Sequence, residues 1–318
     1  MNDSVHVPIL LGPIVESLME PFRALPDSAP PHILVDCTFG GGGHTRAFLE
    51  AFASESKLSK HKVVGLDQDP GAIARGNQNF DAQIRAGQLE LRHLHFKDAD
   101  QVLNSAPCLG LLADLGFSSD QIQDGERGLS FQSDGPLDMR LDPTQGISAR
   151  DHLARMNERE LEKVLSEYGE ENFSRRIAQA ILRTKSEEKG LPRTTRELAE
   201  VISKAVPPNA RYGRLHPATR TFQALRILVN NELNELDCLL ERVILLLKPR
   251  GRVAILSFHS LEDRKVKQIL KPAVSSRHLD QAPFRALTKK PLQAEEAEVL
   301  RNPRSRSAKL RIAERTDS

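Results

Sequence analysis

The sequence predicts an α/β protein in which a helical domain interrupts a parallel sheet. Strand and helix patterns alternate between residues 13 and 115, which is typical of parallel strands joined by crossover helices. Residues 151–206 then show helical patterns only, and the alternation resumes after them. We therefore expect one α/β domain built from residues 1–123 and 225–318, with residues 124–224 inserted as a helical domain.

The first part of the α/β domain shows four strand patterns, each followed by a polar or glycine-containing turn. Pro13 suits the start of a helix, because the N–H that proline lacks would have no partner there. Strands are expected near residues 32–38, 62–68, 89–95 and 109–115, and helices near 13–24, 44–54 and 70–79.

The region that follows changes in character. Residues 117–150 are rich in Gly, Asp, Ser and Pro, so we expect a long ordered loop. Within it, residues 134–140 are too polar and glycine-rich for a core, and could cover a pocket or touch substrate. In the helical block, Gly169 and Gly190 are expected to stop two helices. Thr194 to Glu197 offers a capping box for a third.

The last part returns to the α/β pattern. An apolar stripe at helical spacing over residues 225–247 predicts a core helix, and a strand follows at 252–258. Extended runs near 284–290 and 307–314 are expected to pair as a terminal hairpin. Five parallel strands plus such a hairpin form the Rossmann-like arrangement of class I methyltransferases.

Composition indicates an ordinary soluble protein. Of 318 residues, 28% are charged and 39% hydrophobic, and the net charge is +2. The sequence shows no apolar run near the ~20 residues of a membrane span and no secretory signal pattern. Three scattered cysteines indicate reduced thiols, as in a cytoplasmic protein. Cysteine and histidine do not cluster at metal-ligand spacing, so we expect no metal site.

The most informative motif is the glycine run at residues 40–43, between an apolar run that ends in Asp36 and a helical pattern. A strand, a tight turn and a helix N-terminus form the usual ligand site of an open α/β sheet. The run fits neither the dinucleotide fingerprint nor the phosphate-binding loop. Asp67 ends the next strand, where a carboxylate can accept both hydroxyls of a ribose. This combination suits S-adenosylmethionine, and a purely structural turn is the alternative.

Asp114 ends the fourth strand and is therefore placed to face a substrate. Enzymes that methylate exocyclic amines of bases carry there a polar residue, two prolines and an aromatic. Asp114 and Phe117 match the outer positions, while Leu115 and Gly116 replace the prolines. An acceptor at Asp114 would localise the amine lone pair, and an aromatic face would hold an extruded base. Ser119 belongs to the same segment and is a further catalytic candidate, while a turn cap is the alternative role of Asp114.

Other residues are candidates with open alternatives. His259 follows the fifth strand and could contact the base, accept a proton or be structural. Cys108 follows a proline but precedes the fourth strand, so a thiol mechanism is discounted. From Arg301 to Ser318 there are six basic residues against two acidic. Such a patch can hold phosphates, or it can be a solvated surface strand.

With these residues in view, the chain resembles the RsmH (MraW) family, bacterial methyltransferases of cytosine N4 in small-subunit ribosomal RNA. The likeness covers essentially the whole chain. It runs over residues 6–11, 134–140, 168–171, 216–226, 257–264 and 302–311.

The resemblance implies a class I fold with a helical insert for substrate recognition, and S-adenosylmethionine as methyl donor. It implies a cytosine at the decoding centre of 16S rRNA as target, within the small ribosomal subunit. Asp114 would then serve the cofactor, the amine or both, and a homodimer stays open. Matching the family motifs residue by residue implies cofactor contacts from Gly42, Gly43, His44, Asp67, Phe96, Asp114 and Gln121.

The hypothesis is direct transfer of the methyl group to the amine of an extruded cytosine, without a covalent enzyme intermediate. The pocket would be formed by residues 117–140 and 257–264, and the insert and the basic C-terminus would grip phosphates. The rival hypotheses are a cofactor-binding ribosome-assembly factor without catalysis, and a methyltransferase acting on DNA or protein.

Overall fold

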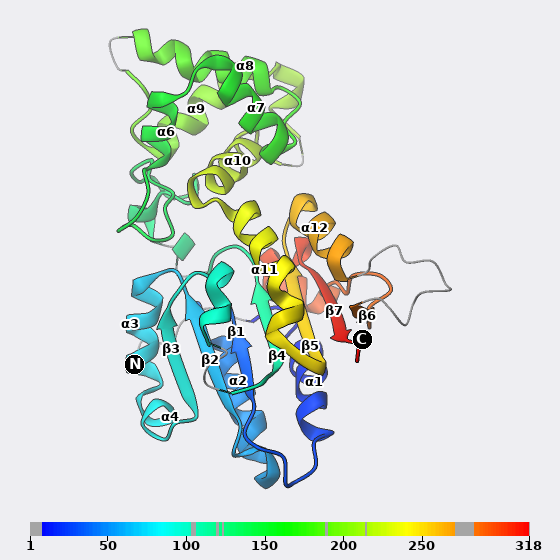
Figure 1. The fold of residues 1–318 in the computed structure, drawn as a ribbon. Coiled ribbons are helices and arrows are strands. Elements are labelled where there is room, and N and C mark those ends of the chain that lie inside the picture. The colour runs from blue at the N-terminus through cyan, green and yellow to red at the C-terminus, as the bar shows by residue number, and fades with distance from the viewer. Residues whose placement is uncertain are drawn as a thin grey trace. The chain divides into compact units, whose positions relative to one another are not determined.

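The computed structural model describes the chain in two compact units (Figure 1). The first consists of Met1–Gly116 and Leu233–Ser318, and the second is Phe117–Glu232. The described residues are 8–102, 106–118, 121–122, 124–187, 190–213, 215–270 and 283–317.

The first unit is built on a seven-stranded sheet with the order β3-β2-β1-β4-β5-β7-β6. Strands β1 to β5 are parallel, while β7 runs antiparallel to both β5 and β6. The strands are β1 (Ile33–Asp36), β2 (Lys62–Asp67), β3 (Leu89–His93), β4 (Cys108–Asp114), β5 (Leu247–Ser257), β6 (Phe284–Ala286) and β7 (Lys309–Arg315). The predicted class I arrangement, five parallel strands plus a terminal antiparallel pair, is confirmed.

Helices cover both faces of this sheet. Successive side chains of a buried strand point to opposite faces, so each strand contributes to two separate apolar cores. On β1, Ile33 and Val35 join a core with α11 and α12, whereas Leu34 joins a core with α1 and α2. The helices are α1 (Leu11–Arg23), α2 (Gly43–Ser54), α3 (Pro70–Asn79), α4 (Asp81–Arg85), α11 (Glu232–Leu246), α12 (Ser260–Leu270) and α13 (Glu296–Arg301), with 3-10 turns η1 (Ser56–Leu58), η2 (Phe96–Val102) and η7 (Pro303–Ser307).

The apolar stripe over residues 225–247 is two helices rather than the single predicted one. Helix α10 (Ala218–Asn230) ends at Asn231, whose backbone is left-handed with φ 51°, and α11 begins at Glu232. Apolar spacing did not indicate the break, since Leu225 and Leu236 are buried on either side of it. Asparagine is one of the few residues that adopt this backbone conformation readily.

The second unit is helical around its own apolar core. Side-chain caps fix several helix starts: Ser148 and Asn157 form capping boxes with the residues three positions later. Thr194 accepts a hydrogen bond from the N–H of Glu197, but the Glu197 carboxylate accepts from Arg193 instead of closing the predicted box. The elements are η3 (Gly125–Arg127), α6 (Ala149–Arg155), α7 (Glu158–Gly169), α8 (Ser174–Arg183), η4 (Thr184–Ser186), α9 (Thr195–Ala205), η5 (Pro208–Ala210) and α10.

The loop at 134–140 contradicts its prediction in one respect, because part of it is core. Leu137, Met139 and Leu141 are all at most 2% exposed and pack into the core of the second unit. The polar residues between them satisfy the backbone: Asp138 accepts hydrogen bonds from the N–H and the guanidinium of Arg140. Inward and outward side chains alternate here without a regular strand.

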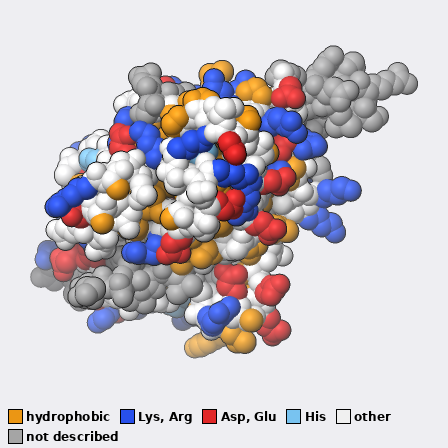
Figure 2. Space-filling view, turned by 90° about the horizontal axis from the view of Figure 1, so that it is seen from below, with side chains coloured by type: hydrophobic (Ala, Val, Ile, Leu, Met, Phe, Trp, Pro, Cys, Tyr) orange, Lys and Arg blue, Asp and Glu red, His pale blue; other side chains and the backbone are white. Residues whose placement is uncertain are grey.

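The surface of the protein is mixed in charge, and its cysteines are not cross-linked. Lys and Arg lie interspersed with Asp and Glu on the face in Figure 2, in keeping with the net charge of +2. Among the described residues we find no helix with the length and apolar character of a membrane span. The three cysteines are free thiols. Cys108 opens β4, at the opposite end from Asp114, and burial raises the pKa of its thiol to about 12, which agrees with discounting a thiol mechanism.

Candidate functional site

Aspartates end three neighbouring strands of the first unit: Asp36 on β1, Asp67 on β2 and Asp114 on β4. The strands are parallel and adjacent, so the three carboxylates lie along one edge of the sheet. This is the edge where open α/β sheets bind their ligands. The candidate site is built from this edge.

The glycine run forms the turn between β1 and α2. The N–H of Gly42 donates to the carbonyl of Phe39 at 2.7 Å, and the φ of Gly42 is +76°. A Cβ on Gly42 would lie 2.7 Å from the Phe80 ring, and one on Gly43 would lie 2.5 Å from Pro8. The packing of the turn therefore requires both glycines. Their contact with a cofactor stays a prediction.

Asp67 ties this turn to the start of α3. Its Oδ2 accepts a hydrogen bond from the N–H of Gly40 at 2.7 Å, and its Oδ1 accepts one from the N–H of Asp69 at 2.8 Å. Burial raises the pKa of Asp67 to about 6. Each carboxylate oxygen can accept a second hydrogen bond, so the group retains capacity for a pair of ribose hydroxyls.

Asp36 is a site residue to which the sequence analysis gave no role. It is 1% exposed, and it accepts hydrogen bonds from the Thr45 hydroxyl at 2.7 Å and from the N–H of Thr38 at 3.2 Å. Burial raises its pKa to about 6. A hydroxyl nine residues downstream, in the first turn of the next helix, is the signal that could have indicated this pair.

Asp114 is held by its backbone while part of its carboxylate lacks a partner. Its N–H donates to the Thr38 hydroxyl at 2.7 Å. Its Oδ1 is buried and has no hydrogen-bond partner among the described residues, while Oδ2 lies 3.7 Å from Nδ1 of His44. Burial raises the pKa of Asp114 to about 8, the nearby charges of Asp36 and Glu262 act in the same direction, and Arg304 opposes them. No turn N–H in the described chain is seen to be capped by this carboxylate, so the turn-cap alternative finds no support.

His44 links the amino-terminal segment to this carboxylate. Its Nε2 lies 3.2 Å from the carbonyl of Ile9. When Nε2 donates a hydrogen bond to this carbonyl, the other ring nitrogen, Nδ1, faces the carboxylate of Asp114 at 3.7 Å. The structure thus places His44 at the site, and its role toward a cofactor stays a prediction.

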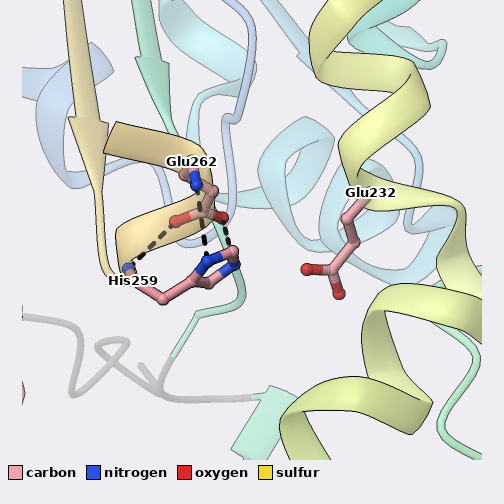
Figure 3. Close-up of side chains that lie close together, drawn as sticks. All are labelled: Glu232, His259 and Glu262. Atoms are coloured by element: carbon pink, nitrogen blue, oxygen red, sulfur yellow. Dashed lines mark hydrogen bonds and ion pairs between the residues drawn. The ribbon is translucent and has the colours of Figure 1, made fainter. Parts of the chain in front are cut away.

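His259 is braced by Glu262 across the first turn of α12 (Figure 3). Its Nε2 lies 3.2 Å from Oε1 of Glu262, and its Nδ1 accepts a hydrogen bond from the N–H of Glu262 at 3.4 Å. The other oxygen of Glu262 accepts from the N–H of Phe258 at 2.8 Å. These contacts hold His259 in place at the start of α12. Contact with a base or proton acceptance stays a prediction.

Three of the six basic residues of the C-terminal segment lie on β7, and their side chains have partners inside the first unit; binding of phosphates by this segment stays a prediction. Strand β7 lies between β5 and β6, and Arg311 is 7% exposed. Arg311 binds both oxygens of Asp263 at 2.7 and 3.2 Å, and Lys309 lies 3.5 Å from the same carboxylate. Arg315 donates to the carbonyl of Leu247. Sequence reasoning missed Asp263, because it lies 48 residues from Arg311.

Phe96 begins η2 after β3 and is partly buried against the core shared by the sheet and α11. The residues beside it carry an ion pair that the sequence did not suggest. His95 Nδ1 lies 2.9 Å from the buried Glu235, and Lys97 lies 3.3 Å from the same oxygen. The hydrogen bond to Glu235 raises the pKa of His95. The contact of Phe96 with a cofactor stays a prediction.

Phe117 and Gln121 belong to the second unit. The guanidinium of Arg226 lies 4.4 Å from the centre of the Phe117 ring. It also donates hydrogen bonds to both carboxylate oxygens of Glu232, at 2.7 and 2.9 Å. Gln121 accepts a hydrogen bond from the N–H of Ser118 at 2.8 Å, and its own N–H donates to the Ser118 hydroxyl. Ser119 lies outside the described residues. The roles assigned to Phe117, Ser119 and Gln121 stay predictions.

The charge at the sheet edge fits a cationic ligand. Burial raises the pKa of three carboxyl groups there, to about 6 for Asp36 and Asp67 and to about 8 for Asp114. Ionising them together inside the protein is unfavourable unless positive charge arrives. S-adenosylmethionine carries a sulfonium and an ammonium group, and the spare acceptor sites on Asp67 and Asp114 suit its hydroxyls and N–H groups.

Comparison with known proteins agrees with this reading. A family model described as the MraW methylase family matches residues 3–316. The chain belongs to the MraW methylase family. It is therefore a methyltransferase, and S-adenosylmethionine is its methyl donor.

Three relatives show how much of the chain the family likeness covers, and each is named Ribosomal RNA small subunit methyltransferase H. The protein of Synechococcus elongatus is 43% identical, over 98% of this chain and 94% of its own. That of Rhodopseudomonas palustris is 43% identical over 100% and 92%. That of Hydrogenovibrio crunogenus is 41% identical over 99% and 98%.

The acid cluster predicts a pH-dependent preference for the charged cofactor. As pH rises from 5.5 to 7.5, Asp36 and Asp67 ionise and attract the sulfonium more strongly. Affinity for S-adenosylmethionine should therefore rise about tenfold relative to S-adenosylhomocysteine. The homocysteine product has the same ribose and amino group but lacks the sulfonium charge, so it is the control. Calorimetric titration of both ligands measures the ratio, and a ratio independent of pH would contradict this electrostatic role.

The unliganded protein should show the opposite dependence in its stability. The pKa values of these aspartates are raised above the unfolded value of 3.8. The stability that the protonated carboxyl groups contribute is therefore fully present below pH 3.8. It is lost as pH rises through about 6 for Asp36 and Asp67 and through about 8 for Asp114. His61, whose pKa burial lowers to about 4, titrates outside the window from pH 7 to 9. In that window the melting temperature should fall in the wild type and less in Asp114→Asn.

Proposed function

We propose that this enzyme methylates the N4 amine of a specific cytosine at the decoding centre of 16S rRNA, in the small ribosomal subunit. Three relatives at 41–43% identity, named as small-subunit ribosomal RNA methyltransferases, support RNA as the substrate. The observation that carries the choice of an amine is Oδ1 of Asp114, buried without a hydrogen-bond partner among the described residues. The proposal places the reaction in the cytoplasm, where ribosomal subunits are assembled.

The chemistry of cytosine explains why such an acceptor is needed. The lone pair of the exocyclic amine is delocalised into the ring, which makes the amine a poor nucleophile. An ionised Asp114 that accepts a hydrogen bond from the amine would localise the lone pair on nitrogen. Its pKa of about 8 keeps the ionised form accessible near neutral pH. The same oxygen could instead bind the ammonium group of the cofactor, and the proposal keeps both roles.

The remaining roles are part of the proposal. S-adenosylmethionine, when bound, supplies an electrophilic methyl group on its sulfonium. Asp67 would accept the ribose hydroxyls, and His44 would border the cofactor beside Asp114. Phe117, Ser119 and His259 are the candidates for contact with the target base. The remaining cofactor contacts that the family motifs imply come from Gly42, Gly43, Phe96 and Gln121.

The test is methyl transfer from labelled S-adenosylmethionine to small ribosomal subunits that lack the modification. The RNA is digested and the labelled nucleoside identified by mass spectrometry. We expect N4-methylated cytidine from a single position. Naked 16S rRNA, single-stranded DNA and ribosomal protein are assayed in parallel. Label in DNA or protein alone would move the assignment to that substrate. No label anywhere, with cofactor binding intact, would favour a non-catalytic assembly factor.

A further inference from the structure

Helix α8 of the second unit carries positive charge only. Among its ten residues are Arg175, Arg176 and Arg183, and the helix contains no acid. The charge of α8 is therefore not offset by acids on the same helix. The neighbouring helix α7, in contrast, carries several glutamates, two of them in its first turn.

A groove of about 460 Å³ lies between α8 and α9, which pack side by side in the second unit (Figure 1). Arg176 and Arg183 line the groove from α8, and Lys204 lines it from α9. The small side chains of Ala180 and Ala205 are also part of its wall. Long cationic side chains thus border a groove that small residues keep open.

These cations are mostly uncompensated. Arg176 and Arg183 form no ion pair within the part of the chain that the structure describes. Lys204 lies 4.0 Å from Glu200, with both side chains exposed, and such a pair contributes little. Glu187 also lines the groove and supplies one negative charge. Among the described residues that line the groove, three are cations and one carries a carboxylate, which favours an anionic partner.

An exposed aromatic follows α9 in the chain, seven residues beyond Ala205. The guanidinium of Arg211 donates to the carbonyls of Lys204 and Val206, at 3.2 and 3.3 Å. This contact ties the following residue, Tyr212, to the end of the helix. Tyr212 is 91% exposed. Cations beside an exposed aromatic ring match the alternation of phosphates and bases in single-stranded nucleic acid.

We infer that the α8–α9 groove binds backbone phosphates of the RNA substrate through Arg176, Arg183 and Lys204, with Tyr212 stacking on a neighbouring base. The inference rests on the proposed function, because it takes RNA as the substrate. It adds a phosphate-binding surface to the one predicted at the basic C-terminus, where Arg311 and Lys309 are paired with Asp263 while Arg301 and Arg306 are exposed.

The first test replaces the two arginines of the groove with uncharged polar side chains. Arg176→Gln with Arg183→Gln should raise the Kd for naked 16S rRNA about tenfold or more at low salt. The slope of log Kd against log salt should fall by about 1.5, because each phosphate contact contributes about 0.7 to 0.9. The matched control is Arg159→Gln with Lys163→Gln on α7. It removes the same charge outside the groove and should leave the slope unchanged.

The second test separates stacking from charge. Tyr212→Ala should weaken RNA binding roughly 5- to 150-fold without changing the salt slope. Tyr212→Phe keeps the ring and should bind like the wild type. All substituted side chains are exposed, and an unchanged melting temperature and cofactor affinity would show that the variants are folded.

The outcomes distinguish this inference from the proposed function. If the wild type neither binds nor methylates 16S rRNA, the proposed function fails and the groove assignment falls with it. If the wild type is active but the groove variant keeps its Kd and salt slope, only the groove assignment is overturned. If the variant binds naked RNA normally but loses affinity for assembled subunits, the groove contacts an acidic protein surface and the inference is again wrong.

Discussion

Asp114→Asn should lower the rate of methyl transfer about 100- to 1000-fold, in the range seen when one stabilising polar group is removed from an active site. The substitution keeps the size of the side chain and the backbone hydrogen bond from its N–H to Thr38. It removes the negative charge and replaces one acceptor oxygen with a donor. Single-turnover rates with small ribosomal subunits measure the effect directly.

The two roles kept open for Asp114 give different results. If it accepts a hydrogen bond from the target amine, kcat falls while the Kd for S-adenosylmethionine changes little. If it binds the ammonium group of the cofactor, that Kd rises in parallel with the loss of rate. The wild-type rate should increase with pH up to about 8 as the carboxyl group ionises, and Asp114→Asn should lose this step.

Asp36→Asn is the control for charge alone. Asp36 lies on the adjacent strand at the same sheet edge, but its oxygens already accept hydrogen bonds from Thr45 and Thr38. It should therefore affect the rate far less than Asp114→Asn, after correction for any loss of folded protein. Equal losses in the two variants would mean that only the total negative charge matters. An unchanged rate in Asp114→Asn would remove it from the mechanism.

The sheet and its functional edge could be predicted because the relevant signals are local. Apolar strands of six and seven residues end at Asp67 and Asp114, and parallel strands bring their carboxyl ends together. The turn at Gly42 was equally visible, since only glycine adopts its backbone conformation without strain. These features depend on residues close in the sequence and on a general rule of α/β sheets.

The partners of the charged residues could not be predicted in the same way. Arg311 meets Asp263 from 48 residues away, and Asp114 is 70 residues from His44 in sequence but 3.7 Å from it in space. Charge counting therefore could not show which basic residues of the C-terminal segment, such as Arg311 and Lys309, are already paired inside the protein. The loop with Leu137 and Met139 was misjudged for a related reason: its burial depends on partners elsewhere in the second unit.

The second large effect is expected for Gly128→Ala, because Gly128 packs against the backbone of this loop. Gly128 has φ +63°, and a Cβ there would lie 1.9 Å from the carbonyl oxygen of Pro136 and 3.1 Å from the N–H nitrogen of Asp138. Both contacts are with backbone, so no side-chain rotation relieves them. The segment must move away by more than about 1 Å to restore contact distances near those of packed atoms.

Such a shift would break the attachment of the loop to its surroundings. The N–H of Met139 donates to the carbonyl of Arg127 at 2.9 Å, and the guanidinium of Arg127 donates to the carbonyl of Leu141 at 2.8 Å. Losing these bonds would withdraw Leu137 and Met139 from the core of the second unit. We expect a loss of about 3–5 kcal/mol in the free energy of unfolding, the range of severe core substitutions.

Gly146→Ala is the matched control, because Gly146 has nearly the same backbone, φ +67°, but a Cβ there would meet nothing within 4 Å. It carries only the strain of a left-handed alanine, about 1–2 kcal/mol. Urea unfolding and hydrogen exchange of the amides of residues 125–141 measure both variants. Faster exchange confined to the second unit, with S-adenosylmethionine binding retained, would show that the loop stabilises the insert independently of the site at the sheet edge. Equal stability of the two variants would mean that the loop tolerates the displacement, and that its apolar residues contribute little to the core they enter.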